Sequence, residues 1–375
     1  MMKRVRIILL ACWVAFGGLE GAYRLYKLDQ YGMIDYPDVL SLGYFEPHPQ
    51  YGYVAKKNFH SDSLPAKTRN HPRLRIHFGQ PFSTNSWGYR GREFSIQKNP
   101  DTFRIVVLGG STTMCMELPD EETWSARLEA GLNSDPDFLR RHGKKKVEVI
   151  NASNGGWKSR EVLIRLQQEV CKLNPDLILL ALNWNDTWRG ISGEDTESPE
   201  QSSRPWWYHV KLFQNLRIRY LRSTDYNPAY NNRLRLHLRR DQGWVHSFVW
   251  NLVQMQRTAS QIHASAMLVD LPGLCRVQSL GTPEYQQALD QTRVTAVTYP
   301  LLAEVKEFES ALFQDMGREL QIPVLDVAGR MEHFSGSERP KLFIDEMHVT
   351  KWGATQIARA VQTELSAHLP RPVEK

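Results

Sequence analysis

The sequence predicts an α/β fold in which helices cover both faces of a parallel β-sheet. From Phe103 onward, uniformly apolar segments alternate with segments of helical periodicity. Strands that are apolar along their whole length are typical of parallel sheets, because such sheets are covered on both faces. The chain has 375 residues, 41% of them hydrophobic and 23% charged, as expected of a globular protein with one large domain or two. We therefore expect a three-layer α/β/α sandwich.

Five strands and four helices are expected in this alternation. The expected strands are 103–110, 146–153, 176–183, 265–271 and 322–329. The expected helices are 121–132, 159–173, 301–313 and a final helix from near 350 to 365. In the first helix, Trp124, Leu128 and Leu132 recur at the spacing that places apolar side chains on one face.

Two segments lie outside the alternation. Residues 27–100 are rich in Pro, Gly, Tyr, His and Asn, and we expect an irregular lead-in that packs on the main domain at 101–370. Residues 190–262 interrupt the main domain as an insertion with an Arg-rich and Trp-rich stretch. The sequence therefore predicts one principal domain with an N-terminal extension and an internal insertion.

The insertion has two interpretations. Its aromatic and basic side chains could form a cap that binds a sugar or a membrane surface, because aromatic faces stack on sugar rings and Arg pairs with carboxylates. The residues concerned are Trp206, Trp207, Arg217 and Arg219. Alternatively, the Trp and Leu side chains pack inward and the Arg side chains point to water, as in an amphipathic lid.

The first 26 residues resemble a targeting segment. The basic run MMKRVR precedes the apolar run IILLACWVAFGG, which is short for a membrane span of roughly 20 residues. Residues 1–26 are therefore interpreted as a signal anchor or a cleaved signal peptide, and LLAC at Cys12 also resembles a lipoprotein cleavage box. Because the positive charges should stay in the cytoplasm, the rest of the chain is expected to be periplasmic or at the cell surface, membrane-attached or secreted.

Charge and cysteine usage exclude several protein classes. The net charge of +6 suits membrane lipid or an acidic polymer, and no nucleic-acid-binding signature accompanies it. The four cysteines form no CxxC pair, and the histidines share no ligand spacing. We therefore expect no nucleic-acid partner, no disulfide framework and no metal.

The stretch RIVVLGGSTTM raises the question of what Ser111 does. A phosphate-binding loop would require a Lys after the glycines, and the dinucleotide pattern would require a third glycine where Met114 stands. A nucleophilic serine requires a base, usually a histidine oriented by a carboxylate. The segment IDEMH offers Asp345 and His348, and their spacing on a turn lets the carboxylate accept from the imidazole.

Acyl transfer also needs donors for the oxyanion. The segment NASNGGW supplies glycine amides after the second expected strand, and NWND supplies the Asn185 side chain after the third. Because ligands of open α/β sheets bind at the carboxyl ends of the strands, these segments should lie near Ser111. The glycines before Ser111 are expected to leave space for a substrate carbonyl.

The order GGS, NASNGG, NWND and DxxH resembles the motif blocks of the SGNH hydrolases, also called GDSL hydrolases, over about 103–190 and 320–366. The resemblance implies a flavodoxin-like five-stranded sheet and a serine mechanism without a cofactor. It implies that Ser111 is the nucleophile and that Asp345 and His348 complete the triad. The implied oxyanion donors are the Ser111 amide, Gly156 (with Gly155 as the competing register) and Asn185, and Trp184 and Trp157 are candidate substrate-lining residues.

Two departures from the family pattern stand out. Block I reads GGST rather than GDSL, which keeps a turn of small residues before the serine. Asn183 replaces the glycine of GxND, so the backbone there is less permissive.

The preferred function is that of a serine esterase acting on a carboxylic ester, with an O-acetyl group on an extracytoplasmic glycan as the preferred substrate. One alternative uses the same triad but transfers the acyl group to a sugar hydroxyl. Another is a non-catalytic polysaccharide-binding or assembly protein on the same scaffold. That last alternative predicts a degenerate site, whereas all catalytic residue types of the family are present here.

Overall fold

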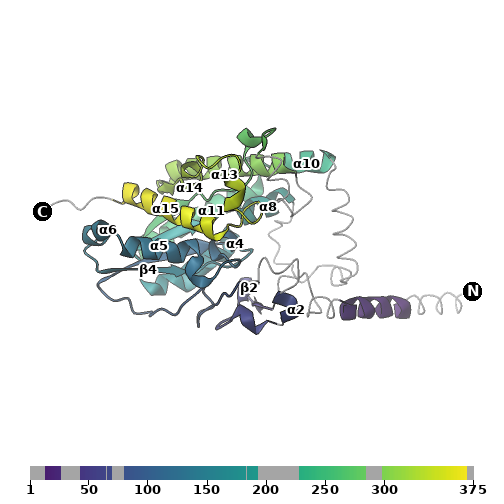
Figure 1. The fold of residues 1–375 in the computed structure, drawn as a ribbon, viewed down its shortest axis with the longest axis horizontal. Helices are drawn as coiled ribbons and strands as arrows, with labels where there is room; N and C mark the ends of the chain where they lie inside the picture. Colours follow the sequence, from purple (N-terminus) through teal and green to yellow (C-terminus); the bar gives the residue numbers. More distant parts are fainter. Residues whose placement is uncertain are drawn as a thin grey trace, which may run out of the picture.

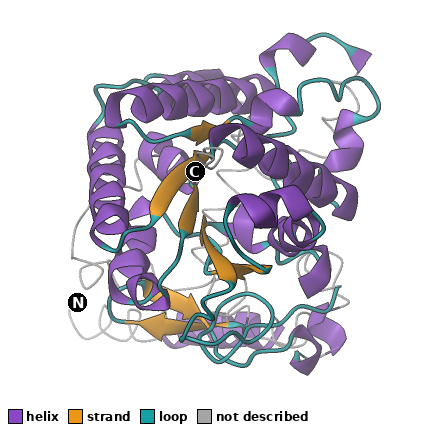
Figure 2. Ribbon diagram, turned by 90° about the vertical axis from the view of Figure 1, so that its left-hand side faces the viewer, coloured by secondary structure: helices purple, strands orange, loops and turns teal. Residues whose placement is uncertain are grey.

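A five-stranded parallel sheet lies at the centre of the molecule (Figure 2). The computed structural model describes residues 13–26, 43–64, 66–69, 80–182, 184–192, 228–283 and 298–369. The strands of the sheet are β3 (Thr102–Gly109), β4 (Lys146–Asn151), β5 (Leu177–Ala181), β6 (Ser265–Val269) and β7 (Val324–Leu325). Their spatial order is β4-β3-β5-β6-β7, which is the flavodoxin-like order. The predicted fold class is confirmed.

The last strand is much shorter than expected. β7 has two residues, whereas the apolar pattern suggested a strand over 322–329. Asp326 follows directly, and its side chain accepts a hydrogen bond from the Gly329 amide to begin the helical turn α14 (Val327–Arg330). Helix capping therefore ends this strand, which pairs with β6.

Helices alternate with the strands along the chain. After β3 come α4 (Ser111–Met114), α5 (Trp124–Asn133) and α6 (Pro136–Arg141), and after β4 comes α7 (Ser159–Gln168). Among the described residues after β5 lie α8 (Trp184–Ser192), α10 (Pro228–Arg235) and α11 (Gly243–Gln261). The C-terminal part contains α13 (Tyr299–Leu320) and α15 (Lys351–His368). Short 3₁₀ helices lie at Ser61–Ser63, Asp120–Glu122, Val170–Leu173, Val277–Ser279 and Arg339–Leu342.

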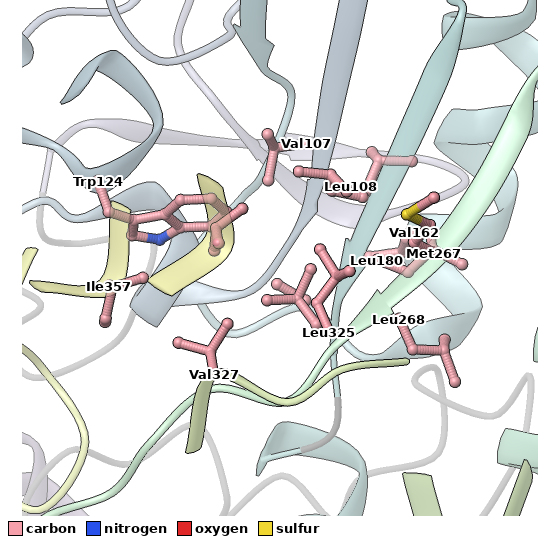
Figure 3. Packing of buried hydrophobic residues seen from close by; sticks show 14 of the residues in the cluster. Val107, Leu108, Trp124, Val162, Leu180, Met267, Leu268, Leu325, Val327 and Ile357 are labelled. Carbon is pink, nitrogen blue, oxygen red and sulfur yellow. The ribbon is translucent and has the colours of Figure 1, made fainter. Parts of the chain in front are cut away.

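The helices form the two outer layers of a three-layer sandwich. α5 packs with α15, and the two lie side by side in Figure 1, whereas α7 packs with α11. Figure 3 shows Trp124 of α5 and Ile357 of α15 on one side of the strands, and Val162 of α7 on the other. All three side chains are at most 2% exposed, so the apolar pattern of the strands reflects burial on both faces.

The lead-in packs against the sheet domain through its own aromatic cluster. Strands β1 (Phe45–His48) and β2 (Gly52–Ala55) form an antiparallel hairpin, and the short helix α2 (Ala66–Arg69) follows. Tyr44, Phe45 and Phe82 of this segment are buried together with Met114 and Met116, which follow Ser111 in the chain. The lead-in thus contacts the segment that carries the expected nucleophile.

The second half of the predicted insertion forms part of the sandwich. Helix α11 lies between β5 and β6 in the chain and packs on α7 and β6, with Trp244, Phe248 and Leu252 buried. It is therefore the connection that a parallel strand pair requires. The cap residues Trp206, Trp207, Arg217 and Arg219 lie outside the described residues.

The N-terminal segment is described in part. Residues 13–26 are helical, and large apolar side chains such as Trp13 and Leu25 are exposed there. Residues 1–12, which include the basic run and Cys12, lie outside the described residues. None of the helices in the described part of the chain combines the length and the apolar character that a membrane span requires.

Candidate active site

Ser111 lies at the carboxyl end of β3, at the first residue of α4. The chain passes from β3 to β4 on one side and later to β5 on the other, so Ser111 is at the point where the strand order reverses. A side chain on Gly109 would collide with the Ala181 carbonyl, and one on Gly110 would begin 2.6 Å from the Asn185 amide nitrogen. Protein atoms therefore occupy the space that a side chain at either position would need, which explains why both residues are glycine.

Ser111, His348 and Asp345 form one hydrogen-bonded chain. His348 Nε2 is 2.9 Å from Ser111 Oγ, and His348 Nδ1 is 2.8 Å from Asp345 Oδ2. In the neutral imidazole, Nδ1–H donates to Asp345 and Nε2 accepts from the Ser111 hydroxyl. The other carboxylate oxygen of Asp345 accepts from the amides of Met347 and His348, at 2.9 and 2.7 Å. These bonds hold the loop before α15 in place, 237 residues from Ser111 in the chain.

Three carboxylates surround the His348 ring. Besides Asp345, Glu117 Oε1 lies 3.9 Å from Nε2, and the neighbouring Glu346 is 4% exposed. Burial alone would lower the pKa of His348, but Glu117 and then Asp345 outweigh burial and raise the pKa to about 10. Burial also acts to raise the pKa of Asp345, yet the His348 imidazolium lowers it below the usual range. The site therefore stabilises a charged imidazole.

The candidate oxyanion donors lie after the ends of β3, β4 and β5. The amides of Ser111, Gly155 and Gly156 have no hydrogen-bond acceptor within the described part of the chain. The side-chain amide of Asn185, at the start of α8, lies beside Gly110 and donates to the Trp157 carbonyl at 2.8 Å. Either Gly155 or Gly156 can therefore be the oxyanion donor, because each amide is able to donate to a ligand.

Asp186 connects the two loops that supply these donors. It is 5% exposed, and its carboxylate accepts from the Ser159 amide and, at 2.6 Å, from the Ser159 hydroxyl. Burial raises its pKa to about 7, although the Ser159 hydrogen bonds oppose the rise. Because Ser159 begins α7, Asp186 joins the start of α7 to α8, the helix that carries Asn185.

The two candidate substrate-lining tryptophans differ in their placement. Trp157 is 2% exposed, its ring stacks on Tyr51, and the Arg165 guanidinium lies 4.1 Å from the ring centroid. The structure therefore places Trp157 inside the protein, not at a surface that substrate contacts. Trp184 begins α8 and is half-buried against the core. Its neighbour Asn183 lies outside the described residues.

Two residues beside the site went unnoticed in the sequence. Glu117 stands alone among apolar residues in MCMEL, directly after the nucleophile turn, and an isolated carboxylate in such a run is a detectable signal. Tyr53 of β2 donates to the Gly155 carbonyl, 102 residues away. No periodicity or spacing in the lead-in indicates that contact.

A separate cavity of about 690 Å³ lies beyond β6 and β7, at the same edge of the sheet. Its lining does not include Ser111 or His348. Two ion pairs lie in its lining, Asp270 with Lys306 at 2.5 Å and Arg276 with Glu332 at 2.9 Å. We therefore assign no ligand to this cavity.

Comparison with known proteins finds an esterase among the proteins that are similar in sequence. No family model matches the sequence. An arylesterase from Vibrio mimicus is 37% identical over 88 residues, which are 24% of this chain and 40% of that protein. This match to an esterase agrees with the resemblance to the SGNH/GDSL hydrolases. The matched part spans less than half of the arylesterase, so the activity of that protein does not by itself assign one to this chain.

Solved structures of esterases and lipases are also similar to this chain. TesA is 16% identical with a TM-score of 0.41, over 70% of this chain and 98% of TesA. Axe2, an acetylxylan esterase from Geobacillus stearothermophilus, is 13% identical with a TM-score of 0.44, over 72% and 97% of the two chains. A GDSL-like lipase from Bacteroides thetaiotaomicron is 15% identical with a TM-score of 0.36, over 71% and 89%. No function is assigned from likenesses at this level.

Proposed function

We propose that this protein is a serine esterase that hydrolyses a carboxylic ester through Ser111. The observation that carries the proposal is the hydrogen-bonded chain from Ser111 through His348 to Asp345, at 2.9 and 2.8 Å. A serine hydroxyl needs such a base to lose its proton, and the base needs a carboxylate to fix its tautomer.

The reaction begins when the Ser111 hydroxyl attacks the acyl carbon and His348 Nε2 takes its proton. The negative charge that forms on the carbonyl oxygen is stabilised by the amides of Ser111 and Gly156 and by the Asn185 side chain. His348 then gives the proton to the leaving alcohol, which departs and leaves an acyl-enzyme. Water attacks this acyl-enzyme with His348 again as the base, and the acid and free Ser111 are released.

Hydrolysis of p-nitrophenyl acetate by the full-length protein tests this proposal. At alkaline pH, where His348 is neutral, Ser111→Ala should lower turnover by about 10⁴-fold or more. The matched control is Ser134→Ala, which removes an exposed hydroxyl at the end of α5 and should retain full turnover. Equal rates for Ser111→Ala and the parent protein would refute the mechanism.

The finer proposal is that the ester is an O-acetyl group on a glycan outside the cytoplasm. It is supported by the basic and apolar N-terminal run, interpreted as a signal anchor or signal peptide, and by the Arg-rich and Trp-rich stretch after 190. In this proposal the N-terminal segment attaches the protein to the cytoplasmic membrane or is cleaved on export.

Acetate release from acetylated glycans tests the finer proposal. Wild-type protein should release acetate from an acetylated polysaccharide, and Ser111→Ala should not. Adding a sugar acceptor to the p-nitrophenyl acetate reaction distinguishes the two fates of the acyl group. Accumulation of acetylated sugar in place of acetate would instead support acyl transfer.

A further inference from the structure

The hydroxyl of Tyr53 lies against the loop that follows β4. It donates a hydrogen bond to the Gly155 carbonyl at 3.0 Å, and Asn154 adds a longer bond of 3.3 Å to the same oxygen. The hydroxyl also occupies the place where a side chain on Gly156 would begin, and Gly156 has a φ of +76°. Only glycine combines this backbone conformation with such close contact. Tyr53 is therefore packed on the peptide group that joins Gly155 to Gly156.

This peptide group carries the candidate oxyanion donor. A trans peptide is planar, so its carbonyl and its N–H point in opposite directions. A hydrogen bond to the Gly155 carbonyl therefore fixes the direction of the Gly156 N–H, and it polarises the group so that the N–H becomes a stronger donor. The Gly156 N–H has no acceptor among the described residues, so its capacity is retained for a ligand.

The next two carbonyls of the loop are held in the same manner. Arg189 donates to the Gly156 carbonyl at 3.3 Å, and Asn185 donates to the Trp157 carbonyl at 2.8 Å. Each of three consecutive carbonyls thus accepts a bond from a side chain of another element, and β2 supplies the first of these.

We propose that Tyr53 is a positioning residue for the esterase reaction, whose hydroxyl orients the Gly155–Gly156 peptide toward the oxyanion. This inference rests on the proposed function, because it assigns a role at the same site. Two backbone groups of β2 also hold the loop, since the Ala55 amide donates to Asn154 at 2.9 Å and the Tyr53 carbonyl accepts from the Trp157 indole at 3.0 Å. Both bonds persist in Tyr53→Phe, which therefore removes the hydroxyl and leaves the hairpin docked.

The test measures Tyr53→Phe with p-nitrophenyl acetate and with a trifluoromethyl ketone. Ser111 adds to that ketone to form a hemiketal oxyanion, and its proton passes to His348. We expect kcat to fall about tenfold with KM nearly unchanged, a smaller loss than the roughly 10²- to 10³-fold typical of removing an oxyanion donor. The affinity for the ketone should fall by the same factor as kcat/KM, because both report the oxyanion.

Tyr51→Phe is the matched control. Tyr51 lies just before β2, and its hydroxyl donates to Glu169 at 2.6 Å, away from the loop carbonyls. Both variants lose one partly buried tyrosine hydroxyl and its hydrogen bond, so both should lower thermal stability to a similar extent. Only Tyr53→Phe should weaken binding of the ketone.

The outcomes separate the inference from the proposed function. Rates are normalised by titrating the folded active sites with the ketone, so partial misfolding does not mimic the effect. Parental kcat and ketone affinity in Tyr53→Phe, with an inactive Ser111→Ala, would overturn the inference and leave the esterase intact. Loss of stability in Tyr53→Phe with unchanged ketone affinity would also overturn it. An active Ser111→Ala would instead overturn the proposed function.

Discussion

The oxyanion donors lie on one side of the Ser111 hydroxyl and the base His348 on the other, and different interactions hold the two sides in place. On one side, the loop after β4 and the start of α8 are held by neutral hydrogen bonds from Tyr53 and Asn185 and by close packing at glycines. On the other side, His348 is held by charge, with Asp345 at 2.8 Å and Glu117 at 3.9 Å. The oxyanion side fixes the direction of hydrogen-bond donors, whereas the charged side sets the protonation state of His348.

Because of this difference, we expect the reaction rate to respond differently to changes on the two sides. The neutral hydrogen bonds from Tyr53 and Asn185 keep their strength across the pH range in which enzymes are assayed, so removing either of them should lower the rate without displacing the pH profile that His348 sets. The charged side should respond to both mutation and pH, because the base works only when His348 is neutral. Variants on each side should therefore differ in the shape of their pH profiles as well as in rate.

Asp345→Asn, on the charged side, should lower the rate more than a variant of Asn185 or Glu117. The new amide oxygen can still accept from the backbone, but its NH₂ group faces His348 Nδ1 and favours the tautomer with the proton on Nε2. That tautomer cannot accept the Ser111 proton, and we expect kcat to fall about 10³- to 10⁴-fold. Steady-state kinetics measure the loss. The control is Asp326→Asn, which changes the carboxylate that caps α14 and should retain activity.

Asn185→Ala should weaken the oxyanion side without changing the pH profile. It removes a donor beside Gly110 and the bond to the Trp157 carbonyl, and kcat should fall about 10²- to 10³-fold. Asn133→Ala is the comparison, since the Asn133 amide bridges α5 to β4 away from Ser111. It should lower stability and leave kcat unchanged. A displaced pH profile in Asn185→Ala would show that the two sides are not independent.

Glu117→Gln should have the smallest effect on the limiting rate and the clearest effect on pH dependence. In the parent protein the pKa of His348 is raised to about 10, so kcat/KM should rise as pH increases toward that value. Removing the negative charge of Glu117 lowers this pKa, so the rise should occur at lower pH. Activity at neutral pH then increases, by about tenfold for each unit that the pKa falls.

A pH profile of kcat/KM measures this change. Glu122→Gln removes a more exposed carboxylate near Arg127 and Lys351 and should leave the profile in place. An unchanged profile for Glu117→Gln would mean that Glu117 does not set the charge of His348.

The sheet could be predicted from sequence because its pattern is local. Each strand core, such as Val106–Leu108 or Leu177–Leu180, is apolar throughout and buried on both faces. The length of β7 could not be predicted, because the Asp326 cap ends it and the apolar pattern continues into α14. The sequence analysis placed helix α11 in the insertion, because the Arg-rich and Trp-rich stretch before it interrupts the alternation of strands and helices.

At the site, the order of short motifs identified the residues that meet, since strand ends of a parallel sheet converge. Ser111, Asn185 and His348 lie together although hundreds of residues separate the first from the last. The environment of these residues was not predictable. Trp157 was expected to line the substrate site, but it is buried and packs on Arg165, because Tyr51 of the lead-in stacks on its ring. Contacts such as that of Tyr53 depend on how the hairpin docks.

The lead-in hairpin also determines where the smallest catalytic part of this chain begins. Tyr53 holds the loop after β4, and Arg90 donates to the carbonyls of Met114 and Leu118 in the turn after the nucleophile. A boundary drawn at the first sheet strand would keep Ser111, Asn185 and His348 but discard both supports. The sandwich and its lead-in are therefore a single module, and a transplant of this catalytic unit to another protein must include the β1–β2 hairpin and Arg90.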